Sequence, residues 1–257
     1  MRIASLPVLV CFCLCSLAGG ALAAEGSLFG AEAKLWRPEV GAEVRSSTDI
    51  LEGTDLDTDD DLDLETVKNA PYLKIWVGGR HRLAASATRL SLHGDTRLDE
   101  TITFNGATYA VGERIETDLD ADIYRVAWEA DWFSNGLFRL GTILGADYFD
   151  VSMSIESDTT GEKEEEDVKG PVPIVGLIGE VDLIWGLSIY GEAAGLYVDY
   201  DDFRGSLIEA EAGVKLTLFE HASLSAGWRQ LNIDVEDDDN DVDLKLGGVT
   251  VGLGIRF

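Results

Sequence analysis

The chain ends in Val249-Thr-Val-Gly-Leu-Gly-Ile-Arg-Phe257, a stretch in which every second residue is apolar. The residues between the apolar ones are threonine, glycine and arginine. Because successive side chains of a β-strand point to opposite faces, this stretch predicts a strand with one apolar face and one small or polar face. In a water-soluble sandwich the polar face would meet solvent. In a membrane barrel the apolar face meets lipid and the other face meets the lumen.

The beginning of the chain favours the membrane barrel. Arg2 is followed by an apolar run from Leu6 to Leu17, and Ala21-Leu-Ala23 supplies the small residues of a cleavage site. This order is typical of a secretory signal peptide, with a retained membrane anchor as the alternative. We therefore expect residues 1–23 to be removed and residues 24–257 to form the mature domain. All three cysteines lie within the expected signal, so the mature chain would contain no disulfide.

An export signal combined with a last strand of the pattern polar-x-Gly-x-x-apolar-x-aromatic resembles the Gram-negative outer-membrane β-barrel proteins. Thr250, Gly252, Ile255 and Phe257 occupy the four positions of the pattern. In that class the last strand is recognised by the barrel-assembly machinery, so the resemblance implies that these four residues form the assembly signal. It also implies localisation in the cell outer membrane. The implied partners are the assembly machinery, outer-membrane lipid and lipopolysaccharide.

The rest of the chain repeats the alternating pattern, which predicts an all-β fold: a transmembrane antiparallel up-and-down β-barrel of about ten strands, with eight or twelve as alternatives. The expected strands are residues 31–44, 72–78, 81–93, 116–133, 137–155, 172–185, 187–200, 206–219, 223–235 and 244–257. Short turns and long acidic connections alternate between them. This places both termini and the short turns on the periplasmic side.

Two local features interrupt this pattern. Asn105-Gly106, flanked by short apolar-alternating arms, predicts a hairpin that projects above the barrel; two further barrel strands are the alternative. The alternation slips near Arg229, which suggests a β-bulge there.

Aromatic residues gather at the short-turn end of the expected strands. An interfacial aromatic girdle is predicted there, with aromatic core packing as the alternative. The girdle residues are Trp132, Trp185, Phe219 and Phe257.

The faces opposite the apolar ones carry charges of both signs, so the lumen is expected to be lined by ion pairs. The inward residues are Glu32, Lys34, Lys74, Arg82, Arg125, Glu129, Asp131, Arg139, Asp147, Glu180, Asp182, Glu192, Glu209, Glu211, Lys215 and Arg256. Charges that are cut off from water must be paired or hydrated. Because ten strands lie close to the size at which side chains fill a barrel, we expect at most a narrow water path.

The formal charge of −28 excludes nucleic-acid binding by bulk electrostatics. Alternating aspartates offer hard oxygen ligands for weak binding of Ca²⁺ or Mg²⁺, although neither run has the glycine and terminal glutamate of an EF-hand. They are Asp55, Asp57 and Asp59 in one run and Asp237, Asp239 and Asp241 in the other. Solvated acidic loops are the alternative, and bound cations that bridge the carboxylates to lipopolysaccharide phosphates are a further hypothesis.

Catalytic motifs are scarce. Only His93 lies near the expected outer rim, and it belongs neither to an Asp-x-His element, as in the omptin proteases, nor to the His-x-Ser element of the lipid A 3-O-deacylases. We therefore expect a non-enzymatic protein without cofactor, structural or surface-interacting, with at most narrow small-solute permeability. A narrow cation-preferring channel is the first alternative. An outer-leaflet lipid- or peptide-modifying enzyme centred on His93 is the second, and the oligomeric state stays open.

Overall fold

The computed structural model describes residues 28–46, 56–57, 69–99, 101–104, 107–161, 163–200, 203–219, 221–237 and 240–257. The expected signal peptide lies outside these residues and stays a prediction. The long strands are β1 (Phe29–Ser46), β3 (Ala70–Gly78), β4 (His81–Arg97), β7 (Arg114–Ser134), β8 (Phe138–Ser157), β9 (Lys163–Asp182), β10 (Leu187–Tyr200), β11 (Phe203–Leu218), β12 (Ala222–Asp237) and β13 (Asn240–Arg256). Within the described part of the chain no helix is long and apolar enough to cross a membrane.

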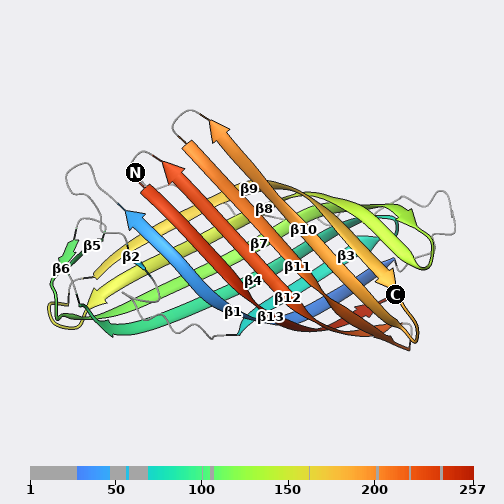
Figure 1. The fold of residues 1–257 in the computed structure, drawn as a ribbon, viewed down its shortest axis with the longest axis horizontal. Helices are drawn as coiled ribbons and strands as arrows, with labels where there is room; N and C mark the ends of the chain where they lie inside the picture. Colours follow the sequence, from blue (N-terminus) through green and yellow to red (C-terminus); the bar gives the residue numbers. More distant parts are fainter. Residues whose placement is uncertain are drawn as a thin grey trace, which may run out of the picture.

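The strands close into a barrel. Each long strand pairs antiparallel with the next, and β13 pairs with β1 in an unbroken register from Gly30↔Arg256 to Ser46↔Asn240 (Figure 1). The barrel has ten strands, so the predicted fold class and strand number are confirmed. A two-residue strand, β2 (Leu56–Asp57), adds to the edge of β1.

The two ends of the barrel differ. At one end, called the turn end, the chain reverses tightly after β3, β7, β9 and β11, and Phe29 and Phe257 exchange backbone hydrogen bonds of 3.1 and 2.9 Å. The opposite end is called the loop end. Strands β7, β8 and β9 reach far toward it. Most of the acidic run before residue 172, expected as a loop, is paired strand, because β9 begins at Lys163 and pairs with β8 from there onward.

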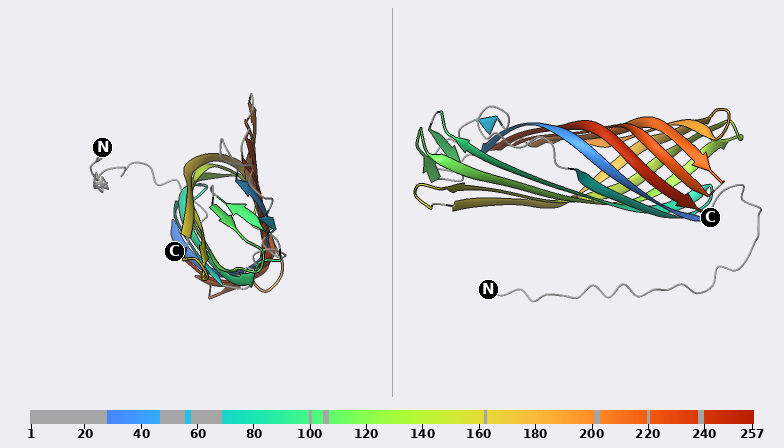
Figure 2. Two further views of the ribbon diagram at one scale, coloured as in Figure 1. Left: turned by 90° about the vertical axis from the view of Figure 1, so that its left-hand side faces the viewer. Right: turned by 90° about the horizontal axis from the view of Figure 1, so that it is seen from below.

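The predicted hairpin exists, but its position differs from the prediction. Strands β5 (Ile102–Phe104) and β6 (Ala107–Tyr109) pair only with each other. Ile102 and Tyr109 are completely buried within the apolar core, and the hairpin lies inside the barrel outline when the barrel is viewed from the loop end (Figure 2). The apolar arms of the hairpin therefore fold into the mouth of the barrel and do not project above it.

The suspected bulge at Arg229 is wrong. The register of β12 is continuous on both sides, from Leu218↔Ala222 to Arg204↔Glu236 with β11 and throughout its pairing with β13. The irregularity falls instead in β7, between Asp131 and Phe133.

Strands β4, β7 and β8 reverse their polarity halfway along. On β8 the outward side chains near the turn end are apolar: Phe138, Leu140, Leu144, Ala146 and Tyr148. From Asp150 onward the outward side chains are polar: Asp150, Ser152, Ser154 and Glu156. The inward side chains change in the opposite sense, from Arg139 and Asp147 to Phe149, Val151, Met153 and Ile155.

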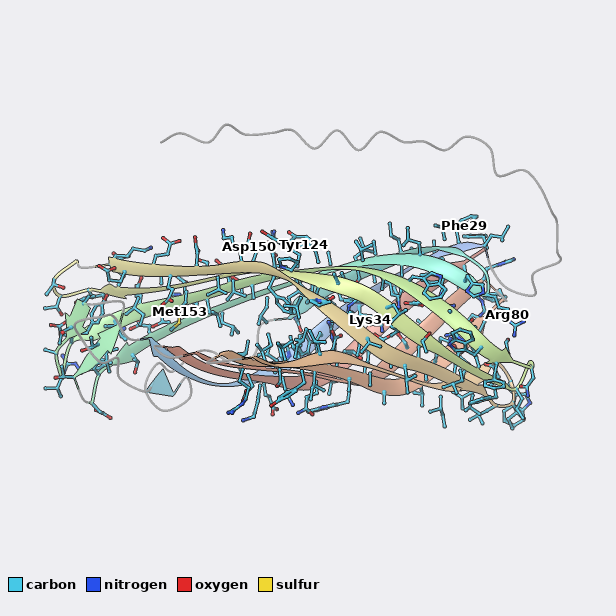
Figure 3. All side chains as sticks on the ribbon, turned by 90° about the horizontal axis from the view of Figure 1, so that it is seen from above. Phe29, Lys34, Arg80, Tyr124, Asp150 and Met153 are labelled. Atoms are coloured by element: carbon cyan, nitrogen blue, oxygen red, sulfur yellow. The ribbon has the colours of Figure 1, made fainter. Side chains whose placement is uncertain are left out.

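This reversal divides the barrel into two halves of opposite polarity. The turn-end half has an apolar band outside and charges inside, as a membrane-spanning barrel requires. The loop-end half has charges outside and an apolar core inside, as a water-exposed domain requires. Figure 3 shows Met153 between the sheets, and Tyr124 and Asp150 on the outer surface near the change of polarity.

Tyrosines mark the border between the halves. Tyr124 and Tyr148 lie directly opposite each other in the register of β7 and β8, and both are exposed. The next outward residues toward the loop end are Asp122 and Asp150. Tyr and Trp are enriched at membrane–water interfaces. This pair of tyrosines at the border between the apolar band and the polar outer wall was not predicted from the sequence.

At the loop end the wall separates into two sheets among the described strands. The pairing of β9 with β10 ends at Gly195↔Val175, and β3 ends at Ala70, opposite Trp36. Strands β4, β7, β8 and β9 thus form one sheet, and β10, β11, β12, β13 and β1 form the other. The apolar core draws side chains from both sheets, such as Ile155 from β8 and Leu231 from β12.

Three lysine substitutions on β8 test the reversal of polarity. Leu144→Lys places a charge in the apolar band and is expected to lower the free energy of unfolding by about 2–4 kcal/mol in lipid vesicles. Met153→Lys places an unpaired charge in the apolar core and is expected to cost about 3 kcal/mol or more. Ser154→Lys, outward beyond the border, is expected to change stability by about 0.5 kcal/mol at most.

Urea unfolding of the vesicle-inserted variants measures these differences. A cost for Ser154→Lys as large as that for Leu144→Lys would contradict the border at Tyr148, because the apolar band would then extend to Ser154.

Candidate functional site

The interior of the turn-end half is a layer of paired charges. Lys34 Nζ lies 2.7 Å from Glu211 Oε1 and 3.5 Å from Glu32. The Tyr190 hydroxyl donates a second hydrogen bond of 2.7 Å to the same Glu211 oxygen. Each of these residues comes from a strand whose alternation points it inward. Together they satisfy the buried ammonium, as a charge removed from water requires.

Further ion pairs extend this layer across the barrel. Lys74 lies 2.7 Å from Glu129 and 3.7 Å from Glu192. Arg125 forms a bidentate pair with Asp147 at 2.7 Å. Other pairs of the layer are Arg82 with Glu129 and Asp131, Arg139 with Asp131 and Glu180, and Lys215 with Glu180.

Arg229 is the central residue that the sequence reading missed. It is buried in the barrel interior, where its Nη2 lies 2.9 Å from Glu209, and Glu209 also accepts a 2.6 Å bond from Arg125. The expectation of a bulge removed Arg229 from the inward set. An unbroken alternation Ser225, Gly227, Arg229 would have placed it there.

Cations and aromatic rings alternate where the polar layer meets the apolar core. The Arg229 guanidinium carbon lies 4.8 Å from the centre of the Trp36 ring and 5.0 Å from that of Tyr72. Lys34 Nζ follows at 5.4 Å from Tyr72 and 5.3 Å from Tyr190. Attraction between a cation and an aromatic face strengthens as water is removed. The stack of cations and rings therefore joins the charged layer to the apolar core on the loop-end side.

The apolar core closes the interior on the loop-end side. Its fully buried members include Ile115, Ile155, Leu90 and Leu92. The β5–β6 hairpin covers it, with the Tyr109 hydroxyl donating to the Ile155 carbonyl oxygen at 3.2 Å. Protein interiors of this kind are densely packed and hold few voids larger than a water molecule.

On the turn-end side the interior is open. A cavity of about 870 Å³ enters between the strands and ends at the charged layer, with Lys34, Lys74 and Glu192 among its lining residues. Asp182 and Arg256 also line it; both belong to the predicted inward set, but they are exposed at the opening rather than buried. This cavity is called the vestibule; the ion pairs of the charged layer close its inner end.

The four predicted girdle residues lie at the turn end with exposed side chains. Trp132 is held by a 3.0 Å hydrogen bond from Nε1 to Thr142 Oγ1. Trp185 and Phe219 are 90% and 92% exposed, and both have positive φ angles, 60° and 52°. A bulky residue in this left-handed region costs about 1–3 kcal/mol. The turns thus keep two strained aromatic residues outside the barrel.

The proposed assembly residues occupy alternate faces of β13. Thr250 and Gly252 are buried toward the lumen, and Ile255 faces outward. A Cβ atom at Gly252 would lie 2.6 Å from Ser225 Oγ and 2.7 Å from Lys34 Cγ, so this position holds only glycine without displacement. The ring of Phe257 stacks on Phe29 at 5.3 Å and on His221 at 5.4 Å.

His93 lies within β4, on the outer wall of the loop-end half, and not in a loop. Its Nδ1 lies 2.8 Å from Asp118 Oδ1. Asp95 pairs not with His93 but with Arg114, whose bidentate hydrogen bonds lower the pKa of the Asp95 carboxyl. His93, Asp95 and Asp118 therefore stand on an exposed outer face of the barrel and do not line its interior.

A His-x-Ser element does occur elsewhere, at His221-Ala222-Ser223, and the sequence reading passed over it. It lies at the turn end, where His221 Nδ1 is 3.1 Å from the Arg256 carbonyl oxygen. The ring is occupied by stacking on Phe257.

No cluster of histidine and carboxylate side chains suited to a metal ion occurs among the described residues. Of the six aspartates predicted as weak Ca²⁺ or Mg²⁺ ligands, Asp55, Asp59 and Asp239 lie outside them. The backbone of Asp57, Asp237 and Asp241 belongs to β2, β12 and β13, which corrects their assignment to loops.

Solved structures of outer-membrane β-barrels match this architecture at low sequence identity. The outer membrane protease OmpT of Escherichia coli is 11% identical, with a TM-score of 0.59, over 92% of this chain and 99% of that chain. Ail, the attachment invasion locus protein of Yersinia pestis, is 14% identical, with a TM-score of 0.35, over 90% and 99% of the two chains. No family model and no curated protein matches the sequence.

The similarity to OmpT concerns the fold alone. The similarity to OmpT, the apolar band and the closed antiparallel sheet together define the chain as a transmembrane β-barrel of the outer-membrane class.

Arg229→Met tests the buried charge layer. Removing this cation leaves Glu209 with one cation fewer in a buried site, so we expect a loss of about 3–5 kcal/mol in unfolding free energy. Arg89→Met is the matched control: Arg89 makes a bidentate pair with Asp122 on the exposed outer wall, and its removal is expected to change stability far less. Urea unfolding in vesicles provides both values.

Adding Glu209→Gln to Arg229→Met is expected to recover part of the loss, since the excess buried negative charge disappears. Equal effects of Arg229→Met and Arg89→Met would show that the interior is hydrated.

Proposed function

We propose that the chain is a non-conducting integral protein of the outer membrane that holds a rigid domain above the outer leaflet. The turn end then faces the periplasm and the loop end faces outward, as the short turns and the joined termini favour. The observation that carries the proposal is the closed interior: a layer of paired charges crosses the barrel at the inner end of the vestibule, and an apolar core fills the loop-end half.

This interior argues against the cation-preferring channel. Ion conduction needs a continuous hydrated path, whereas the charged vestibule ends beneath Trp36, Leu231 and other fully buried apolar residues. The charged layer pairs its anions with cations, such as Glu209 with Arg125 and Arg229, so most of its negative charge is neutralised and is not available to select cations.

The outward domain is tall enough to stand above the lipid surface. From Asp150 to Ser157, β8 continues beyond the border, and eight residues at about 3.4 Å each with a tilt of about 45° rise about 20 Å. A rigid domain of this height suits structural support or contact with other surfaces. No arrangement among the described residues favours the alternative of an enzyme centred on His93.

Lipopolysaccharide is the partner that the border of the apolar band favours. Arg37 on β1 and Arg89 on β4 are the first outward residues beyond the apolar Leu35 and Ala87, and both are exposed. Lys169 holds the same position on β9. Cations at this height lie near lipid phosphates, although Arg89 and Lys169 are also paired there with Asp122 and Asp150 and the chain as a whole is strongly acidic.

Planar-bilayer recording tests the sealed interior. The purified full-length barrel is expected to produce no steady conductance steps, because no water path crosses both layers. Glu209→Gln and Asp120→Asn serve as a pair of variants, the first inside the lumen and the second on the outer wall. Steady steps whose size changes with Glu209→Gln, but not with Asp120→Asn, would overturn the proposal.

Thermal unfolding in two kinds of vesicle tests the lipid contact. Lipopolysaccharide-containing vesicles are expected to raise the midpoint above that in phosphatidylcholine vesicles, and Arg37→Gln with Arg89→Gln is expected to remove most of this increment. Arg97→Gln is the control, because Arg97 lies on the same outward face of β4 but farther from the border. An undiminished increment in the double variant would refute the contact.

A further inference from the structure

Strand β9 offers an open edge at the loop end. Its pairing with β10 ends at Gly195↔Val175, while its pairing with β8 continues to Glu156↔Lys163. Above Val175, β8 is therefore its only ladder partner among the described strands. An edge of this kind can receive an added strand.

The register shows which backbone groups point toward the open edge. Asp182 N donates to the Leu137 carbonyl oxygen at 2.8 Å, in continuation of the β8–β9 ladder. Since alternate residues of a strand bond to opposite neighbours, even-numbered residues of β9 bond to β8 and odd-numbered residues point to the open side. The donors of Asp167 and Lys169 consequently face the edge.

Two prolines protect part of this edge. Pro171 and Pro173 are odd-numbered, so each removes a donor from the open side and none from the ladder with β8. Their presence confines any added strand to the segment between Lys163 and Gly170, beyond the apolar band. An eight-residue segment is long enough to accept a short extended peptide.

The chemistry around this segment is acidic with an apolar neighbour. Glu164, Glu165, Glu166 and Asp167 follow one another along β9. Val168, between them and the prolines, has its side chain on the core-facing side of the strand and is nevertheless 62% exposed. A second copy of the same edge would bring acidic runs together, and like charges in facing strands are destabilising.

We propose that the β9 edge from Lys163 to Gly170 binds an extended basic peptide by strand addition. The peptide backbone bonds to the odd-numbered residues, its lysine or arginine side chains face Glu165 and Asp167 on the outer face, and an apolar side chain contacts Val168 on the core-facing side. Backbone bonds supply affinity and the carboxylates supply selectivity for positive charge. The site differs from the sealed lumen and does not depend on it.

A labelled peptide with alternating lysine and valine, nine residues long, is the probe. Its binding is measured by fluorescence anisotropy with the full-length protein in phosphatidylcholine nanodiscs, against a glutamate–valine peptide of equal length. We expect saturable binding of the lysine peptide only. Asp167→Pro removes one edge donor and one carboxylate without touching the β8 ladder, and it is expected to weaken binding about tenfold.

Two further variants separate backbone addition from charge attraction. Asp167→Asn removes the same carboxylate but keeps the donor, and it is expected to weaken binding less than Asp167→Pro does. Asp120→Asn, on the outer face of β7, is expected to leave binding unchanged. Urea unfolding of each variant confirms that the barrel is intact.

Three results would overturn the proposal: no saturable binding by the unmodified protein, equal binding by Asp167→Pro and the unmodified protein, or equal losses in Asp167→Pro and Asp167→Asn. The last would mean that charge alone holds the peptide. Because conductance plays no part in these measurements, failure here and failure of the sealed-lumen proposal are distinguishable.

Discussion

The whole molecule depends on one constraint: a strand of about twenty residues must pass from hydrocarbon into water. Its side chains alternate between two faces throughout, but the solvent outside changes from lipid to water partway along. The sequence meets this change by exchanging apolar and polar residues between the faces. Tyr148 followed by Asp150 on the outside of β8, and Asp147 followed by Phe149 on the inside, mark the exchange.

The exchange also organises the interior. Below it, buried charges require partners, and the lysine and arginine side chains meet carboxylates from other strands. Above it, apolar residues need no partner and pack as in a soluble protein. Arg229, between the rings of Trp36 and Tyr72, belongs to both environments, because its charge bonds to Glu209 while its faces contact aromatic carbon.

Local alternation was sufficient to predict the barrel and its strand number. It also predicted that the termini and the short turns lie at one end of the barrel and the long connections at the other. It was insufficient where tertiary contacts decide. The run from Glu162 to Asp167 reads as a solvated loop, but pairing with β8 makes most of it a strand. The arms of the β5–β6 hairpin are too short to span a bilayer, yet the pattern alone does not reveal that an apolar core lies within reach of Ile102 and Tyr109. Arg229 was missed because a supposed slip in period replaced a regular alternation.

The joining of β1 to β13 has a consequence for how the molecule is made. These strands lie at opposite ends of the chain, and their ladder runs from Gly30↔Arg256 to Ser46↔Asn240. Pairing between segments so distant in sequence is entropically slow, since the longest loop must close before the contacts form. Until the last segment arrives, β1 keeps a bare edge and the oily outer surface has no lipid around it. An unpaired strand edge and an exposed apolar surface make such an unfinished barrel prone to aggregation, so the late closure of β1 on β13 is the vulnerable step of its folding.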